Sequence, residues 1–236
     1  NGEIVVGNKE FLVSCAASAG PAFEGSGVLS GMRATKGAIQ KATINPASLD
    51  VKYITIGNIK PKGICGSGYI DLISEMLRVK LIDKSGNILL SDNKHVRSGE
   101  YGKEFILAQS SETAIDKDIV ITEADIDNIK RAKAAIYSAC LTLLRHLDLG
   151  FEAVDKFFIA GGFGTSIDIE KSIAIGLLPD LDKNKFIFVG NSSLGGARQV
   201  LLSSQAHRKT QEIAKKMHYF ELSIDTRYMD EYMAAL

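Results

Sequence analysis

The sequence predicts an α/β fold in which helices cover a mixed sheet, and three observations support this class. Strand-like apolar runs occupy much of the first sixty residues. A long amphipathic helix is predicted from Thr122 to Leu147. Beyond it, strands alternate with helices, and the first of these strands, Val154–Ala160, ends in glycines. Strands first, then strands alternating with helices, are typical of a layered α/β domain.

The chain begins with a predicted β-hairpin. The apolar runs Ile4–Val6 and Phe11–Val13 flank Gly7-Asn8, a dipeptide that favours a two-residue hairpin turn. Both runs are continuously apolar, which is typical of strands that are buried on both faces. We therefore expect both faces of this hairpin to be covered.

The middle of the chain is expected to combine strands, a helix and loops. In order, the predicted elements are strands at Ala38–Ile44 and Val51–Ile56, a helix from Gly66 to about Leu77, a turn at Asp83–Asn87, strands at Ile88–Leu90 and Glu104–Ala108, and an exposed, mobile loop at Ser91–Lys103.

The helix from Thr122 has clear start and stop signals. Thr122 and Asp125 resemble a capping box, and Gly150 ends the periodic pattern. The residues with helical spacing on its apolar face are Ile126, Ile129, Ile136, Cys140, Leu143 and Leu147. After it we expect strands at Val154–Ala160 and Phe186–Val189, a helix at about Ser193–Leu202, a short helix after Gln205, a strand near Tyr219–Leu222 and a terminal helix.

Composition limits the classes of function. The chain has 236 residues, enough for one large domain or two small ones, and its 28 Lys and Arg balance 28 Asp and Glu. This balance argues against a nucleic-acid or anionic membrane partner. No apolar run approaches the roughly 20 residues needed to span a bilayer.

The cysteines indicate a reducing compartment. Cys15, Cys65 and Cys140 are odd in number and widely spaced, which does not fit a disulfide framework. We therefore expect a cytoplasmic protein. Neither a CxxC nor an HxxxH pattern occurs, so we expect no metal site made by this chain alone.

Glycines follow the predicted strand Val154–Ala160. Gly161, Gly162, Phe163 and Gly164 would lie at its carboxyl end, where ligands of α/β sheets commonly bind. Glycine lets the backbone approach a flat ring or a phosphate. The alternative is a tight turn packed against a helix. The segment is not GxGxxG, and no GxxxxGK[ST] loop occurs, which argues against a Rossmann dehydrogenase and a P-loop ATPase.

A second glycine-rich segment opens a predicted helix. The amides of Gly66, Ser67 and Gly68 would attract an anion, and the Ser67 hydroxyl could donate to it. The alternative is a helix start without a ligand, in which Cys65 is a small core residue.

Two further loops have both a ligand-binding and a structural interpretation. Gly20 and Glu24 lie in a loop of small residues that could lie against phosphate or ribose, with Glu24 reaching a hydroxyl. Asn191 lies in a turn that could face a nucleotide. Either loop is equally an ordinary connection. Cys15 is interpreted as buried filler or, alternatively, as a redox thiol.

Taken together, several segments resemble the carboxyl-terminal lobe of the reductive activators of corrinoid proteins. This family belongs to the superfamily of acetate and sugar kinases, Hsp70 and actin. The matching segments are Asn1–Val5, Ala19–Gly25, Gly31–Ala34, Gly37–Ile39, Cys65–Gly68 with Ile70-Asp71, Lys133–Ile136, Ile159–Gly164, Ile175–Asp180, Gly190-Asn191 and Leu194–Ala197. Their order and spacing, more than any one of them, carry the resemblance.

The resemblance implies a ribonuclease-H-like, actin-like ATPase lobe with inserted strands and loops. An inserted subdomain is expected around residues 32–120. In the family an Asp-Ile-Gly-Thr phosphate clamp directly precedes the Asn-Gly-Glu that contains Gly2. We therefore expect a chain cut from a longer parent, without its amino-terminal ferredoxin domain and first lobe.

The resemblance also implies site residues and cofactors. By analogy Gly161, Gly162, Phe163 and Gly164 form the adenosine loop, and Gly20 to Glu24 lie near ribose or phosphate. ATP or ADP with Mg²⁺ is the implied ligand, and a [2Fe-2S] cluster is implied for the absent ferredoxin domain.

The implied activity is that of the parent, which would return cob(II)amide to cob(I)amide on a corrinoid protein. That partner would be a corrinoid iron-sulfur protein or the corrinoid subunit of a methyltransferase, and a homodimer is implied. We expect this chain alone to hydrolyse ATP poorly or not at all. A related branch of the family binds a metal cluster shared between subunits through a Cys-Ala-Ala-Gly-Thr-Gly segment. The present sequence matches that segment from Cys15 to Ala17 and differs after it.

Two other classes of function stay open. The lobe could be a non-catalytic docking or dimerisation module. The protein could also be a small-molecule kinase of the same superfamily, which needs a carboxylate base near the γ-phosphate. Glu3 is the nearest candidate for that base in the sequence.

Overall fold

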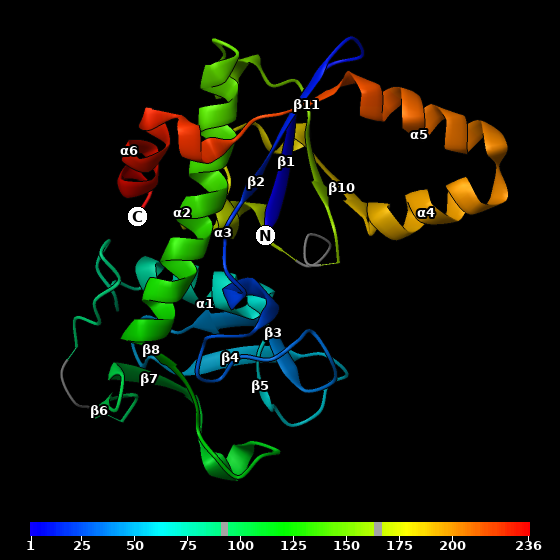
Figure 1. Ribbon diagram of the computed structural model, residues 1–236. Coiled ribbons are helices and arrows are strands. Elements are labelled where there is room, and N and C mark those ends of the chain that lie inside the picture. The colour runs from blue at the N-terminus through cyan, green and yellow to red at the C-terminus, as the bar shows by residue number, and fades with distance from the viewer. Residues whose placement is uncertain (91–93, 163–166) are drawn as a thin grey trace. The chain divides into compact units, whose positions relative to one another are not determined.

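The structure is a computed structural model that describes residues 1–90, 94–162 and 167–236 (Figure 1). Its contacts divide the chain into two compact units, and each is described here by itself. Unit 1 comprises Asn1–Ser18, Ala134–Ser166 and Pro179–Ala235, and unit 2 comprises Ala19–Lys133, Ile167–Leu178 and Leu236. Unit 2 contains the whole of the range 32–120, and that this range is an insertion stays a prediction.

Unit 1 combines two sheets with helices. Its strands are β1 (Gly2–Gly7), β2 (Leu12–Ala17), β9 (Phe157–Ala160), β10 (Phe186–Gly190) and β11 (Met217–Tyr219). Its helices are the second half of α2 (Glu123–His146), α4 (Ser192–Leu202), α5 (Ser204–Lys216) and α6 (Thr226–Ala234). In one sheet β2 pairs antiparallel with β1 and parallel with β11, whereas β9 and β10 form a parallel pair. The predicted mixed α/β class is confirmed.

The predicted hairpin is confirmed, but its turn is longer than two residues. Gly7 still pairs with Leu12. The turn then runs from Asn8 to Phe11, and the Asn8 amide donates to the Phe11 carbonyl at 2.9 Å. The Asn8 side-chain oxygen accepts from the Glu10 amide at 2.8 Å. The Asn8 side chain thus accepts a hydrogen bond that a backbone carbonyl often accepts in a turn. The Gly7-Asn8 dipeptide therefore did not indicate how long the turn is.

The hairpin buries one face, so the prediction that both faces are covered is wrong. Val13, Cys15 and Ala17 alternate along β2 and pack into a core with Leu143 of α2. On the other face Val5 is 48% exposed. In an antiparallel strand pair with one covered face, buried and exposed side chains alternate along each strand.

Unit 2 also holds two sheets. Its strands are β3 (Ala38–Ile44), β4 (Val51–Thr55), β5 (Gly63–Ile64), β6 (Val96–Gly99), β7 (Gly102–Ala108) and β8 (Ile119–Thr122), and its helices are α1 (Gly66–Arg78), α3 (Ile169–Ala174) and the first half of α2. β3 is central between antiparallel β4 and parallel β5, and β6, β7 and β8 form an antiparallel sheet. The predicted strands at 38–44 and 51–56 and the helix from Gly66 are confirmed.

The predicted capping box at the start of α2 is also confirmed. The Thr122 hydroxyl accepts from the Asp125 amide at 3.0 Å, and the Asp125 carboxylate accepts from the Thr122 amide at 2.9 Å. Asp125 also accepts from the Leu29 amide at 2.7 Å, so the cap ties a preceding loop to the helix.

Two predictions in the middle of the chain are wrong. Ile88–Leu90 is not a strand: Ile88 makes an isolated bridge, and its amide donates to the Glu123 carboxylate at 2.9 Å. Part of the predicted loop is the strand β6, where buried Val96 pairs with Phe105. The sequence of β6 is mostly polar because its other side chains are exposed.

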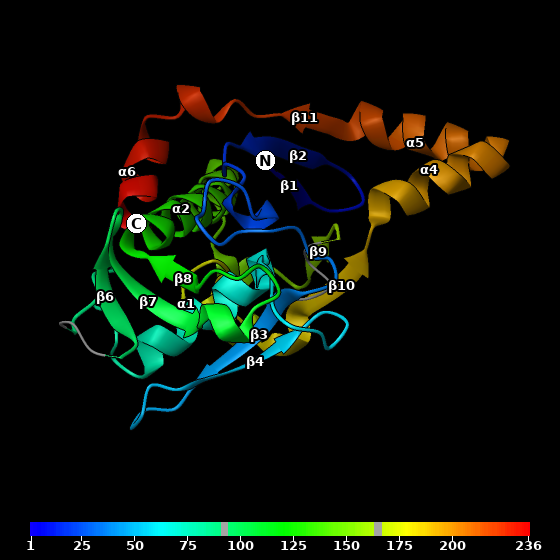
Figure 2. The ribbon, with the colours of Figure 1, turned by 90° about the horizontal axis from the view of Figure 1, so that it is seen from below.

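The carboxyl-terminal part of unit 1 differs in length from the prediction. α5 has 13 residues where a short helix was expected, and β11 ends at Tyr219 rather than near Leu222. α4 and α5 meet at the turn around Ser203 and diverge from it in both views (Figures 1 and 2). No helix in the described part of the chain is long and apolar enough to cross a membrane.

The contact between α1 and β3 gives a test of packing. A Cβ added at Gly68 would lie 2.1 Å from the Ile39 carbonyl oxygen, whereas one at Gly196 would meet nothing within 4 Å. We expect Gly68→Ala to lower the free energy of unfolding by about 3 kcal/mol. Gly196→Ala, the matched control, should raise it by up to about 1 kcal/mol.

Urea unfolding, followed with hydrogen exchange in α1, measures both effects. Equal effects of the two substitutions would contradict this account of Gly68.

Candidate functional site

The predicted site residues divide between the two units. Gly2, Gly161, Gly162 and Asn191 belong to unit 1. Gly20, Glu24, Gly66, Ser67 and Gly68 belong to unit 2. Phe163 and Gly164 lie outside the described residues. The two groups are therefore described separately.

In unit 1 the carboxyl ends of two parallel strands meet at one edge. β9 ends at Ala160, which pairs with Gly190 at the end of β10. The Gly161 amide donates to the Gly190 carbonyl at 2.7 Å. The structure thus brings Gly161 and Asn191 to the same edge of the sheet, where α/β proteins bind their ligands.

The glycines at this edge face open space. A Cβ on Gly161 or Gly162 would meet no heavy atom of the described residues within 4 Å. Gly161 has a φ of 99°, a conformation that favours glycine. No described helix lies within 4 Å of a Cβ at either glycine, and this open surface fits the approach of a flat ring.

Asn191 has a structural role at the same edge. Its side-chain oxygen accepts from the Leu194 amide at 3.0 Å and so caps α4. This cap fixes where α4 begins after β10. A contact between Asn191 and a nucleotide stays a prediction.

Gly2 faces the protein interior. A Cβ at this position would lie 3.3 Å from Cγ1 of Ile136 in α2. The missing side chain therefore lets β1 approach the helix. A contact with phosphate would use only its backbone and stays a prediction.

In unit 2 the loop with Gly20 and Glu24 is partly open. Gly20 has a φ of 69°, with nothing within 4 Å of an added Cβ, and Glu24 is exposed. Gly25 closes this loop, because a Cβ there would lie 2.3 Å from the Met32 carbonyl oxygen. Glu24 is thus exposed at the surface of this loop, and its contact with a ligand stays a prediction.

The segment Gly66–Gly68 is packed into unit 2. Ser67 is 4% exposed, and its hydroxyl lies 3.4 Å from the Cys65 sulfur. The Cys65 thiol donates to the Ile39 carbonyl at 3.3 Å. The structure therefore supports a packing role for this segment, and its contact with an anion stays a prediction.

A charged cluster in unit 2 went unnoticed in the sequence. Lys171 Nζ of α3 lies 2.8 Å from Asp71 Oδ2 and 4.0 Å from Glu75 Oε1, both in α1. Arg78 Nη2 lies 2.7 Å from Glu75 Oε2. In the sequence, only the spacing of Glu75 and Arg78 on one helix indicated an ion pair. Lys171 gave no such signal, because it is 100 residues from Asp71.

The pKa values of Asp71 and Glu75 in this cluster are shifted in opposite directions. Burial raises the pKa of Asp71, and Lys171 offsets this only in part. Burial also acts to raise the pKa of Glu75, but Arg78, the Ile44 amide and Lys171 together outweigh it and hold that pKa below its ordinary value.

The cysteines are buried thiols. Cys15, Cys65 and Cys140 are free and 8% exposed or less. Burial raises the pKa of Cys15 to about 11 and that of Cys140 to about 12. No three His, Cys, Asp or Glu side chains gather to hold a metal ion in residues 1–90, 94–162 and 167–236.

Comparisons with known proteins point to one family. A family model described as the C-terminal domain of RACo, the ASKHA domain, matches residues 1–236. A solved structure described as a reductive activator for corrinoid, iron-sulfur protein superposes with a TM-score of 0.94 and 56% identity, covering 99% of this chain and 37% of that one.

Two curated relatives agree. The corrinoid activation enzyme RamQ of Eubacterium limosum is 34% identical over 241 residues, covering 99% of this chain and 40% of that protein. A Co(II) methylated amine-specific corrinoid protein reductase of Methanosarcina barkeri is 27% identical over 239 residues, covering 92% of this chain and 40% of that protein. The chain thus spans two fifths of the length of these relatives.

The raised pKa values give a test of the cysteines. At pH 8 a thiol with a pKa near 11 is about 0.1% thiolate, against about 25% for a free cysteine. We expect alkylation of Cys15 to be at least about a hundredfold slower than that of free cysteine. Mass spectrometry after iodoacetamide treatment measures it, with urea-unfolded protein as the control.

Because these thiols ionise more readily in the unfolded chain, the free energy of unfolding should also fall as the pH rises above about 9. Rapid alkylation of Cys15 in the native protein would instead support a redox thiol.

Proposed function

The chain belongs to the family of C-terminal ASKHA domains of RACo, and on that premise we propose that its parent is an ATP-dependent reductive activator. It would return cob(II)amide to cob(I)amide on a corrinoid protein. The observation that carries the proposal is the match of the family model to all 236 residues. The names of the solved structure and of both relatives describe corrinoid activation or reduction, which supports the same activity.

In this proposal the edge formed by β9 and β10 receives the adenosine of ATP. Gly161 and Gly162 leave room for a flat ring, and Asn191 holds the start of α4 beside them. Bound ATP supplies a preference for one conformation of the protein over another, as an uphill electron transfer requires. The role of this chain is to bind and orient the nucleotide.

The [2Fe-2S] cluster belongs, in this proposal, to an amino-terminal ferredoxin domain of the parent. The thiols of this chain fit a cluster poorly, because Cys15 and Cys140 are held protonated by burial and metal ligation needs a thiolate. Mg²⁺ would arrive with the nucleotide. The partner would be a corrinoid iron-sulfur protein or a methyltransferase corrinoid subunit, in the cytoplasm, and the activator would act as a homodimer.

One observation favours a second function, a docking or dimerisation module. The apolar side chains of α4 are unusually exposed: Leu194 is 68%, Leu201 85% and Leu202 74% exposed. Exposed apolar groups that cluster on one element are typical of an interaction surface. This function requires no nucleotide contact in unit 1.

Titration of ATP with Mg²⁺ into the full-length parent tests the nucleotide site. Gly162→Leu adds a side chain into open space, so the fold should keep its Tm while ATP affinity falls at least about tenfold. Ala174→Leu places the same side chain at an exposed position of unit 2 and should leave ATP affinity unchanged.

Unchanged ATP affinity in Gly162→Leu would remove the nucleotide from this edge. No ATP binding by the parent at all would leave the docking module. The chain alone should hydrolyse ATP poorly or not at all. Rapid ATP hydrolysis by the chain alone would contradict the proposal that it only binds and orients the nucleotide.

A further inference from the structure

In unit 2 the strand β4 forms one edge of its sheet. It pairs antiparallel with β3, and no strand in the described part of the chain pairs with its other side. Figure 2 shows β4 beside β3, at the outside of that sheet. The proposed function gives this open edge no role. A strand of five residues with one open side can accept a further strand from another chain.

The backbone of β4 presents hydrogen-bonding groups to its open side. In an antiparallel pair, residues that exchange hydrogen bonds alternate with residues that do not. The amides of Ala42 and Ile44 on β3 donate to carboxylates of α1, at 3.3 and 3.0 Å, and so point away from β4. Their partners in the register are Tyr53 and Val51. These two residues therefore direct their own N–H and C=O groups to the open side, as the addition of a strand requires.

One face of the hairpin that β3 and β4 form is exposed and basic. Lys41 lies opposite Ile54, and Thr43 lies opposite Lys52, so these four side chains share a face. All four are exposed. Neither lysine forms an ion pair with a residue in the described ranges 1–90, 94–162 and 167–236. Both charges are therefore free to act on a partner.

The segment around this hairpin has the same sign of charge, although the whole chain is balanced. The basic residues of the range 31–64 are Arg33, Lys36, Lys41, Lys52, Lys60 and Lys62, against the single acid Asp50. Asp50 is already paired with Lys94 and His95, each at 3.1 Å.

An acid from a neighbouring element also acts on β4. Burial, and then the charge of Glu112, raise the pKa of Tyr53. Because side chains alternate along a strand, Tyr53 lies on the face opposite Lys52. Glu112 therefore acts on that other face, and the exposed face keeps its excess of positive charge.

These charges distinguish the occupants of the open edge. A second copy that used both backbone groups would pair Val51 with Tyr53 of the partner subunit, and would set Lys52 directly opposite the partner's Lys52. Like charges in that position destabilise a strand pair, whereas an acidic side chain there stabilises it. A nucleic acid or an anionic membrane would use the lysines and leave the strand-forming groups of β4 without a strand.

We propose that β4 binds an extended acidic segment of a partner protein, which adds to the sheet as a further strand. The N–H and C=O groups of Val51 and Tyr53 hydrogen-bond to its backbone. Acidic side chains on one face of the segment lie beside Lys52 and Lys41, and apolar side chains on its other face lie beside Val51 and Tyr53. This surface belongs to unit 2 and does not depend on the proposed function.

A probe peptide tests the surface. We would titrate a blocked peptide of about six residues, in which glutamate alternates with valine, into the isotope-labelled chain and follow the backbone amides by NMR. The amides of Val51 and Tyr53 should shift and saturate, with a Kd on the order of 0.1–1 mM. Lys215, exposed on α5, is the internal control. Equal shifts of Lys215, or shifts of Val51 that grow with protein concentration without peptide, would overturn the proposal.

Further probes separate charge from strand addition. A peptide with lysine in place of glutamate reverses the charge, and an oligothymidylate of similar length carries negative charge without a strand backbone. Each should bind at least about tenfold more weakly than the glutamate peptide. Equal binding of the lysine peptide would overturn the role of the charges, and equal binding of the oligothymidylate would identify a surface for nucleic acid instead.

Two N-methylated forms of the glutamate peptide test the backbone contacts. Methylation at the valines or at the glutamates removes the amide donors on one edge of the peptide at a time. The form that loses the donors facing β4 should bind at least about tenfold more weakly. Unchanged binding of both forms would overturn the addition of a strand.

A charge reversal tests the lysine directly. Lys52→Glu should weaken the glutamate peptide at least about tenfold and strengthen the lysine peptide, which also shows that the variant is folded. Lys215→Glu, at an exposed position of α5, is the matched control and should change neither affinity. Unchanged affinity of Lys52→Glu for the glutamate peptide would overturn the proposal.

Discussion

The close contact between α1 and β3 is the constraint on which unit 2 depends. Beyond its first two residues β3 has no partner strand on one side in the described part of the chain. There α1 supplies acceptors: Asp71 accepts from the Ala42 amide at 3.3 Å and Glu75 from the Ile44 amide at 3.0 Å. Buried amides without acceptors would be costly. These carboxylates therefore pair backbone groups that a neighbouring strand would otherwise pair, and Lys171 balances their charge by linking α3 to α1. Because α1 is fixed in this way, Ile73 on it is held in the wall of a small pocket, which the loop after α1 and the first half of α2 also line.

Glycine has opposite uses in the two units. At Gly68 the missing side chain lets a helix approach the Ile39 carbonyl, and substitution would force the elements apart. At Gly161 and Gly162 the missing side chain leaves open space at the end of a parallel strand pair. Both segments had the same two interpretations in the sequence, ligand contact or packing. Only the neighbours of each glycine distinguish a residue needed for the fold from one that leaves room for a ligand.

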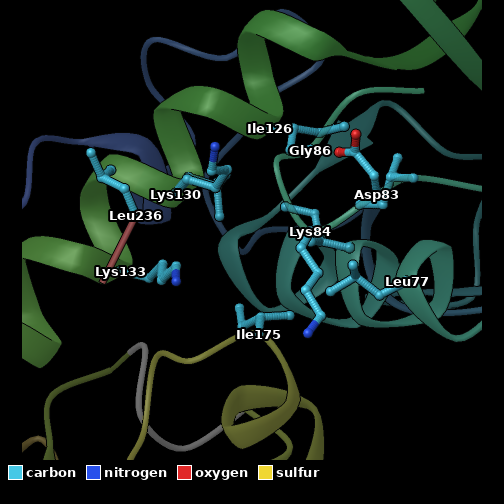
Figure 3. A pocket seen from close by; sticks show the side chains of 12 residues that line it. Leu77, Asp83, Lys84, Gly86, Ile126, Lys130, Lys133, Ile175 and Leu236 are labelled. Atoms are coloured by element: carbon cyan, nitrogen blue, oxygen red, sulfur yellow. The ribbon is translucent and has the colours of Figure 1, made fainter. Parts of the chain in front are cut away.

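The proposed adenosine site and the rest of the chain's surface differ in the side chains that form them. An adenosine site at the end of β9 and β10 needs backbone that a flat ring can approach, and few charged side chains of its own. A small pocket in unit 2, by contrast, is lined by apolar side chains together with Asp83, Lys84, Lys130 and Lys133 (Figure 3). Ile126, Ile129, Lys130 and Lys133 follow one another at helical spacing on α2, so a single face of that helix contributes both apolar and charged side chains to the pocket.

The sequence by itself determined the α/β class, the limits of α1 and α2, and the strands β3 and β4, because their signals are local. Helical spacing and the Thr122–Asp125 cap act within a few residues. The tertiary structure alone decided β6, the extent of the turn after β1, and the pairing of Lys171 with Asp71. A mostly polar strand such as β6 exists because β7 supplies hydrogen-bond partners, and an ion pair across 100 residues requires that the chain first bring α3 to α1. Preferences for a helix, a cap or a strand depend on neighbouring residues, whereas these contacts depend on segments that meet only after folding.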